Sequence, residues 1–165
     1  IDPGMAFGTG QHATTRTALE LMQRIAARGP VLDAGCGSGV LAIAARRLGL
    51  GPVTAIDFDA ESVSATVRAA RANMADCITA ERREIGVDPM PRAEILLANI
   101  TLEVLRLLAA AMGDSHRSGA VPVTAVLSGL REHEVDHAVA AFAPLGLRER
   151  ERLAGDGWAS VRLSA

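Results

Sequence analysis

The stretch Val31-Leu32-Asp33-Ala34-Gly35-Cys36-Gly37-Ser38-Gly39 decides the fold of this chain. Its apolar start predicts a short buried strand, its alternating glycines predict a tight turn, and the Ala-rich residues 40–48 predict a helix closed by Gly49. In open α/β sheets, such a unit leads to a ligand site beyond the carboxyl end of the strand. Glycine in the turn permits positive φ and lets the backbone approach a ligand closely.

Strands and helices alternate on both sides of this unit. Helices are expected over residues 14–27, 60–73 with Asp59 as cap, 102–112 and 132–142, and strands over residues 53–56, 78–80, 94–98 and 121–127. The chain closes with two strand-like runs, residues 145–153 and 158–163, joined by a glycine-containing hairpin turn. We therefore predict one Rossmann-like α/β domain, with a mostly parallel seven-stranded sheet, helices on both faces and a C-terminal antiparallel hairpin.

Composition excludes several classes of function. The 165 residues, 49% of them hydrophobic, suit a single globular domain, and no apolar run is long enough to span a membrane, so we expect a cytoplasmic protein. Cys36 and Cys77 form neither a disulfide framework nor a zinc-ribbon pair. A net charge of -2 gives no electrostatic basis for binding a phosphate backbone, so direct nucleic-acid binding is not expected.

The glycine turn does not match the dinucleotide fingerprint. That pattern, begun at Gly35 and Gly37, requires a third glycine at position 40, where the chain has Val40. Asp57 ends the second expected strand, 22 residues beyond Gly35, where a carboxylate can accept hydrogen bonds from ribose hydroxyls. The alternative for Asp57 is an ordinary loop carboxylate or helix cap, although Asp59 is better placed for capping.

The pattern Asp-x-Gly-x-Gly-x-Gly at residues 33–39 resembles motif I of the class I methyltransferases, whose turn carries the amino-acid end of S-adenosylmethionine. The loop Asp2-Pro3-Gly4, Phe7-Gly8-Thr9-Gly10 and His12-Ala13-Thr14-Thr15 resembles that of the PrmA family, methyltransferases of a large-subunit ribosomal protein. The resemblance continues through Ala55-Ile56-Asp57, Ala98-Asn99-Ile100, Ser128-Gly129 and Trp158, and so covers nearly the whole chain.

The resemblance implies a cofactor, S-adenosylmethionine, and a set of site residues. By position, the cofactor contacts fall on Gly10, Thr15, Gly35, Gly37, Asp57 and Asn99, the catalytic residues are Asn99 and His12, and Phe7 and Thr101 contact the substrate. Gln11, Ala13 and Thr101 depart from the residues that relatives often carry, which puts substrate detail in doubt. Family members also have an N-terminal substrate-recognition domain before Asp2, so we expect residues 1–165 to be a catalytic domain from a longer protein.

The expected reaction is transfer of methyl groups to protein amines, either a lysine side chain or an N-terminal amine, of a ribosomal protein. A lysine amine must first lose its proton, and Asn99 can accept a hydrogen bond from it or contact the cofactor. His12 either assists proton removal or is a loop histidine held by hydrogen bonds. The Asn/Asp-Pro-Pro-aromatic motif of nucleic-acid amine methyltransferases is absent after Asn99, which favours a protein acceptor. The alternative is a similar cofactor-binding domain with another acceptor, a small molecule or a different protein.

One further motif is a remote alternative. His133-Glu134-Val135-Asp136-His137 matches the His-Glu-x-x-His pattern of zinc peptidases. At about 100° per residue, however, both histidines point away from the apolar stripe of the expected helix, and no third ligand is evident. We therefore expect a solvent-facing surface and no metal site.

Overall fold

The computed structural model describes residues 12–115 and 121–165. In these residues, five parallel strands form the body of one sheet: β1 (Val31–Ala34), β2 (Val53–Asp57), β3 (Ile78–Arg82), β4 (Ile95–Asn99) and β5 (Thr124–Arg131). The strands β6 (Arg148–Gly155) and β7 (Trp158–Ser164) form an antiparallel hairpin, and β7 also pairs antiparallel with β5. The strand order is β3-β2-β1-β4-β5-β7-β6, which confirms the predicted sheet.

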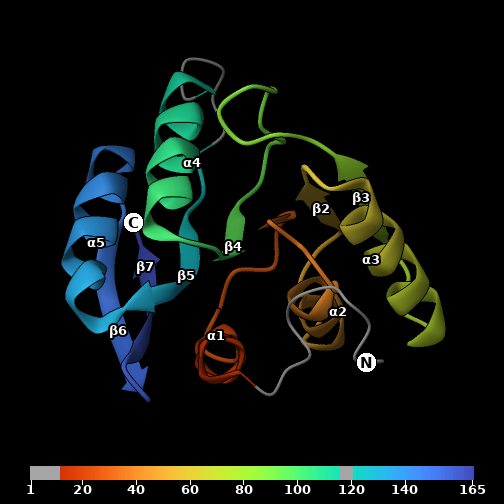
Figure 1. The fold of residues 1–165 in the computed structure, drawn as a ribbon, viewed down its shortest axis with the longest axis horizontal. Helices are drawn as coiled ribbons and strands as arrows, with labels where there is room; N and C mark the ends of the chain where they lie inside the picture. Colours follow the sequence, from red (N-terminus) through yellow and green to blue (C-terminus); the bar gives the residue numbers. More distant parts are fainter. Residues whose placement is uncertain (1–11, 116–120) are drawn as a thin grey trace.

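Five α-helices in the described residues cover the two faces of this sheet (Figure 1). They are α1 (Ala13–Met22), α2 (Val40–Arg47), α3 (Ala60–Ala72), α4 (Leu102–Ser115) and α5 (Val135–Phe142). The helices α4 and α5 pack together over one face, and α1 and α2 pack on the other, each pair with its own apolar core. None of these helices is long and apolar enough to cross a membrane.

The alternation of side chains along the central strands explains the two cores. Leu32 and Leu96 contribute to the core under α4 and α5, whereas their neighbours Val31 and Leu97 contribute to the core under α1 and α2. Successive strand residues point to opposite faces, so a strand covered by helices on both sides must be apolar along its length. Ile95–Asn99 is buried in this way up to Ala98.

Several expected boundaries were wrong. Helix α1 ends at Met22, not at residue 27, because the backbone turns there and carries Ile25 into the core. Strand β5 begins at Thr124, after the proline at position 122, which cannot donate a ladder hydrogen bond.

Two further errors lie in the C-terminal third of the chain. The expected helix over residues 132–142 starts as a 3-10 turn, Glu132–Glu134, and becomes α-helical only at Val135. The final hairpin begins at Arg148, because Ala143–Leu145 forms another 3-10 turn that ends at Gly146 with φ +83°. Glycine adopts this left-handed conformation without a steric penalty.

Candidate functional site

A cavity of about 600 Å³ lies at the carboxyl ends of β1, β2 and β4. The reversal of strand order between β1 and β4 opens this position, where open α/β sheets bind ligands. Its walls come from the glycine turn, the ends of the strands, the chain after β3 and the helix α4. The lining residues are Asp33, Gly35, Cys36, Gly37, Val40, Leu41, Asp57, Phe58, Asp59, Ser62, Arg83, Glu84, Ile85, Asn99, Ile100, Val104 and Leu107.

The glycine turn has the backbone conformation that its sequence predicts. Gly35, Gly37 and Gly39 have φ of 76°, 51° and 80°, values that favour glycine. A Cβ on Gly35 would come within 2.4 Å of the Ile100 side chain, and one on Gly39 would come within 3.0 Å of Thr66. The turn therefore requires glycine for its conformation and for its close packing.

The sequence did not indicate Thr66 as a site residue, yet it holds this turn in place. Thr66 lies on α3, is fully buried, and its hydroxyl lies 3.1 Å from the carbonyl of Gly37 and 3.2 Å from the Cys36 sulfur, so it can donate to either. On the other side of the turn, the Gly37 amide donates to Asp57 Oδ2 at 3.0 Å. A second amide, that of Asp59, donates to Asp57 Oδ1 at 3.0 Å.

Asp59 has the role expected for it, that of the α3 cap. Its side chain accepts from the amides of Glu61 and Ser62, and these hydrogen bonds hold its pKa below the usual value. Asp57 is thus not the cap of α3. Its carboxylate lies at the end of β2 and lines the cavity, as the ribose-binding prediction requires.

Asp33 is a buried carboxylate with only part of its hydrogen-bonding capacity used. Its Oδ2 accepts from the Ala42 amide at 3.0 Å, whereas Oδ1 is buried and has no partner among the described residues. Burial raises the pKa of this carboxyl to about 7, against the lowering effect of the amide. The neighbouring Cys36 thiol is also buried, which raises its pKa to about 12, so the thiol stays protonated at neutral pH.

Asn99 presents a second buried acceptor at the cavity. Its Nδ2 lies 3.4 Å from the Thr15 hydroxyl of α1, and its Oδ1 is buried without a partner among the described residues. A buried acceptor that lacks a donor costs free energy unless a ligand satisfies it. Asp33 and Asn99 therefore suit a cationic group with several N–H donors, such as the α-ammonium group of S-adenosylmethionine. With Asp57 as a partner for ribose hydroxyls, these residues fit the predicted cofactor.

The structure brings most of the described candidate residues together, but not all of them. The cavity is lined by Gly35, Gly37, Asp57 and Asn99. Thr15 does not line it, but its hydroxyl lies within hydrogen-bonding distance of the Asn99 side chain. Thr101 is exposed and lies outside the cavity lining, and its carbonyl accepts the Leu105 amide at the start of α4. Phe7 and Gly10 lie outside the described residues.

His12 is the cap of α1. Its Nδ1 lies 2.8 Å from the Thr14 hydroxyl and accepts from the Thr14 amide at 3.4 Å. Its ring packs edge-on against the Trp158 ring, with the two centroids 5.2 Å apart. The Arg131 guanidinium lies over the Trp158 ring, 3.8 Å from its centroid. This arrangement matches the hydrogen-bonded alternative, and a role for His12 in proton removal stays a prediction.

The zinc-peptidase motif is dispersed over two kinds of helix. His133 lies in the 3-10 turn and His137 in α5, and both side chains are exposed. Asp136, from the same motif, forms an ion pair with Arg152 of β6. In residues 12–115 and 121–165 no group of three or more His, Cys, Asp or Glu side chains is arranged to hold a metal ion.

Comparisons with known proteins show the family of this chain. The family model described as "Ribosomal protein L11 methyltransferase (PrmA)" matches residues 1–165. The chain belongs to this family. Curated relatives named ribosomal protein L11 methyltransferase include that of Dechloromonas aromatica, 41% identical over 87% of this chain and 47% of the relative, and that of Bordetella parapertussis, 39% identical over 96% and 50%. The chain spans about half the length of these PrmA relatives.

Solved structures agree with the fold of this chain. A ribosomal protein L11 methylase from Lactobacillus delbrueckii subsp. bulgaricus superimposes with a TM-score of 0.83 at 30% identity, covering 99% of this chain and 83% of that chain. A precorrin-6y C5,15-methyltransferase from Geobacter metallireducens has a TM-score of 0.69 at 15% identity, covering 92% and 87%. The second comparison concerns the fold alone.

Several residues that line the cavity of this PrmA member were not predicted from the sequence. Phe58 directly follows Asp57, and its side chain is 70% exposed at the cavity. Arg83, Glu84 and Ile85 follow β3, and Leu107 lies on α4. For Phe58 and residues 83–85 the available signal was their position after strand ends, because the carboxyl ends of parallel strands meet at one edge of a sheet. This signal does not apply to Leu107, which lies within α4.

Proposed function

We propose that this chain is the catalytic part of an S-adenosylmethionine-dependent methyltransferase that acts on amines of a large-subunit ribosomal protein. The observation that carries the proposal is the cavity itself, with the Asp57 carboxylate at the end of β2 and two acceptor atoms, Asp33 Oδ1 and Asn99 Oδ1, that have no partner in residues 12–115 and 121–165. Membership of the PrmA family supports a protein acceptor, and the names of its relatives support ribosomal protein L11.

Each residue of the site is assigned one role in binding the cofactor or the acceptor amine. When bound, the cofactor supplies a methyl group on a positively charged sulfur, which passes to the lone pair of the acceptor amine. Asp57 binds the ribose of the adenosine part, and the glycine turn together with Asp33 binds the amino-acid end. Asn99 accepts a hydrogen bond either from that end or from the acceptor amine, and so orients one of them.

The amine must be neutral to react. A free lysine amine has a pKa near 10.4, so only about one molecule in a thousand is neutral at pH 7. The site must therefore favour the neutral form of the amine, and limiting the hydration of its charge has this effect. His12 is the candidate for assisting removal of the proton, and the methyl group replaces that proton on nitrogen.

Calorimetry with S-adenosylmethionine and with S-adenosylhomocysteine tests the cofactor site. Asp57→Ala is expected to weaken binding about tenfold or more, because it removes two charge-assisted hydrogen bonds to ribose. Asp76→Ala is the matched control, since Asp76 is an exposed carboxylate paired with Arg46 outside the cavity. Absence of binding by the unaltered chain would refute the proposal.

Transfer of labelled methyl groups to purified ribosomal protein L11 tests the acceptor. Labelling of its amines supports the proposal. Cofactor binding together with labelling of a small molecule or another protein, and none of L11, would favour the alternative acceptor. Because the chain spans about half of its relatives, the assay should use the longest available form of the protein beside residues 1–165.

A further inference from the structure

Three hydroxyl groups tie the first turn of α1 to the sheet. The Thr17 hydroxyl of α1 lies 2.6 Å from the Ser160 hydroxyl of β7, and Ser160 lies 2.6 Å from the Ser128 hydroxyl of β5. The chain ends on the backbone of α1, because Ser128 Oγ lies 2.9 Å from the Thr14 carbonyl and Thr17 Oγ1 lies 3.0 Å from the Ala13 carbonyl. This hydroxyl chain therefore begins and ends on the same helix.

Burial makes these contacts strong and costly to remove. Ser128 and Ser160 have no exposed surface, so water does not compete for their hydroxyls. Each hydroxyl has one proton to donate, and the protons can all point toward the Thr14 carbonyl or all toward the Ala13 carbonyl, so that every hydroxyl–hydroxyl contact is a hydrogen bond in both arrangements. Loss of the Ser160 hydroxyl removes the link between Ser128 and Thr17, and loss of the Ser128 hydroxyl removes the hydrogen bond to the Thr14 carbonyl.

Ser128 also lies beside β4, the strand that carries Asn99. In the pairing of β4 with β5, Asn99 lies opposite Ser128, and the Ile100 amide donates to the Ser128 carbonyl at 3.2 Å. Ser128 thus holds the end of β4 through its backbone and the first turn of α1 through its side chain. These are the two elements whose side chains, Thr15 and Asn99, meet at 3.4 Å beside the cavity.

We propose that Ser128 and Ser160 are positioning residues, which hold α1 so that the Thr15 hydroxyl orients the Asn99 amide at the cofactor site. This inference rests on the proposed function and deepens it, because it assigns part of the site to the C-terminal hairpin. Neither serine lines the cavity. Their effect passes through α1 and the end of β4.

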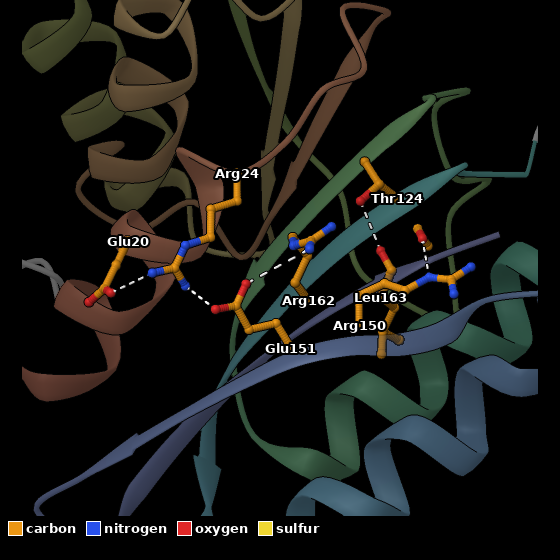
Figure 2. Close-up of polar contacts among 8 residues, drawn as sticks. Glu20, Arg24, Thr124, Arg150, Glu151, Arg162 and Leu163 are labelled. Carbon is orange, nitrogen blue, oxygen red and sulfur yellow. Dashed lines mark hydrogen bonds and ion pairs between the residues drawn. The ribbon is translucent and has the colours of Figure 1, made fainter.

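A second set of contacts joins α1 to the hairpin, but it is more exposed (Figure 2). Arg24 of α1 pairs with Glu20 at 2.9 Å and with Glu151 of β6, and Arg162 of β7 lies 3.8 Å from Glu151. The Arg24 side chain is 39% exposed. Ion pairs of this kind contribute little to stability, so the buried hydroxyls are the more important of these two sets of polar contacts.

Figure 2 also contains the matched control for an experiment. The Thr124 hydroxyl of β5 donates to the Leu163 carbonyl of β7 at 2.8 Å, and Thr124 is buried. Like Ser128, it is a hydroxyl of β5 that bonds a neighbouring element, but it lies at the opposite end of the strand from the cavity. Thr124→Val removes this bond while keeping the shape of the side chain.

The test compares S-adenosylhomocysteine affinity by calorimetry with the melting temperature of each variant. We expect Ser128→Ala and Ser160→Ala each to raise the Kd about tenfold, the effect of one misplaced hydrogen-bonding group. Thr124→Val should lower the melting temperature to a similar extent and leave the Kd within about twofold of the original value. In activity assays the two serine variants should raise the KM for S-adenosylmethionine more than they lower kcat.

A double-mutant cycle identifies the route of the effect. If the serines act through Thr15, Ser128→Ala should change the Kd by less than about twofold when Thr15→Ala is already present. Full additivity, or a Kd increase in Thr124→Val equal to that in the serine variants, would overturn the inference. So would normal affinity in both serine variants. No binding by the unaltered chain would instead overturn the proposed function, and this inference with it.

Discussion

Replacing Asp33 by Asn should remove a specific pH dependence of stability. The buried carboxyl has a pKa of about 7 in the folded chain, against 3.8 for the ordinary group. The folded protein therefore keeps this proton through a pH range in which the unfolded chain releases it. Between about pH 4 and pH 7 the unfolded state binds fewer protons, so the free energy of unfolding falls as the pH rises.

The size of this effect follows from the shift in pKa. A difference of about three pK units, at about 1.4 kcal/mol each, corresponds to a loss of up to about 4 kcal/mol once the pH has passed 7. The amide introduced by Asp33→Asn does not titrate, so the difference in unfolding free energy between this variant and the original chain isolates this one group. Above pH 7, without ligand, the variant should be the more stable protein.

Urea unfolding at several pH values from about 4.5 to 8.5 measures this difference directly. Parallel profiles for Asp33→Asn and the original chain would refute the reasoning, because they would mean that Asp33 is not a strained buried acid. The same variant should bind S-adenosylhomocysteine roughly 10-fold to 100-fold more weakly, since a hydrogen bond to a charged group contributes about 1.5–3 kcal/mol. If the variant is more stable and binds more weakly, Asp33 is a binding residue that lowers the free energy of unfolding of the ligand-free protein.

Three further sets of substitutions test the glycine turn, the end of β5 and the zinc-peptidase motif. Thr66→Val should lower the free energy of unfolding by about 1–2 kcal/mol and weaken cofactor binding, while Thr66→Ser should retain both in the same titrations. Gly129→Ala should lower the melting temperature more than Gly146→Ala; both residues have positive φ, but a Cβ on Gly129 would meet a carbonyl oxygen at 2.6 Å, whereas one on Gly146 would meet nothing within 4 Å. Replacing the exposed His133 and His137 together by Ala should change the free energy of unfolding by less than about 0.5 kcal/mol. Stoichiometric zinc in the purified original chain, absent from this double variant, would support the peptidase hypothesis instead.

The strengths and failures of sequence reasoning can be seen at particular residues. The strand, turn and helix around Gly35 could be predicted, because left-handed φ and hydrophobic periodicity are local requirements. Asp57 could also be placed, since the end of a predicted strand fixes which edge of the sheet a side chain occupies. The early end of α1 and the 3-10 start of residues 132–142 were missed, because element ends depend on how nearby segments pack.

By itself, the sequence determined the class of fold, the glycine turn and its acidic partner Asp57, because each is encoded by neighbouring residues. Only the tertiary structure decided that Asp33 is buried with one oxygen that has no partner in the described part of the chain, that Thr66 holds the turn, and that Ser128 and Ser160 join α1 to the sheet. Thr17 and Ser160 are separated by 143 residues in the chain. Their meeting depends on the strand order that places β7 beside β5 and packs α1 against both, and no local pattern of side chains specifies that contact.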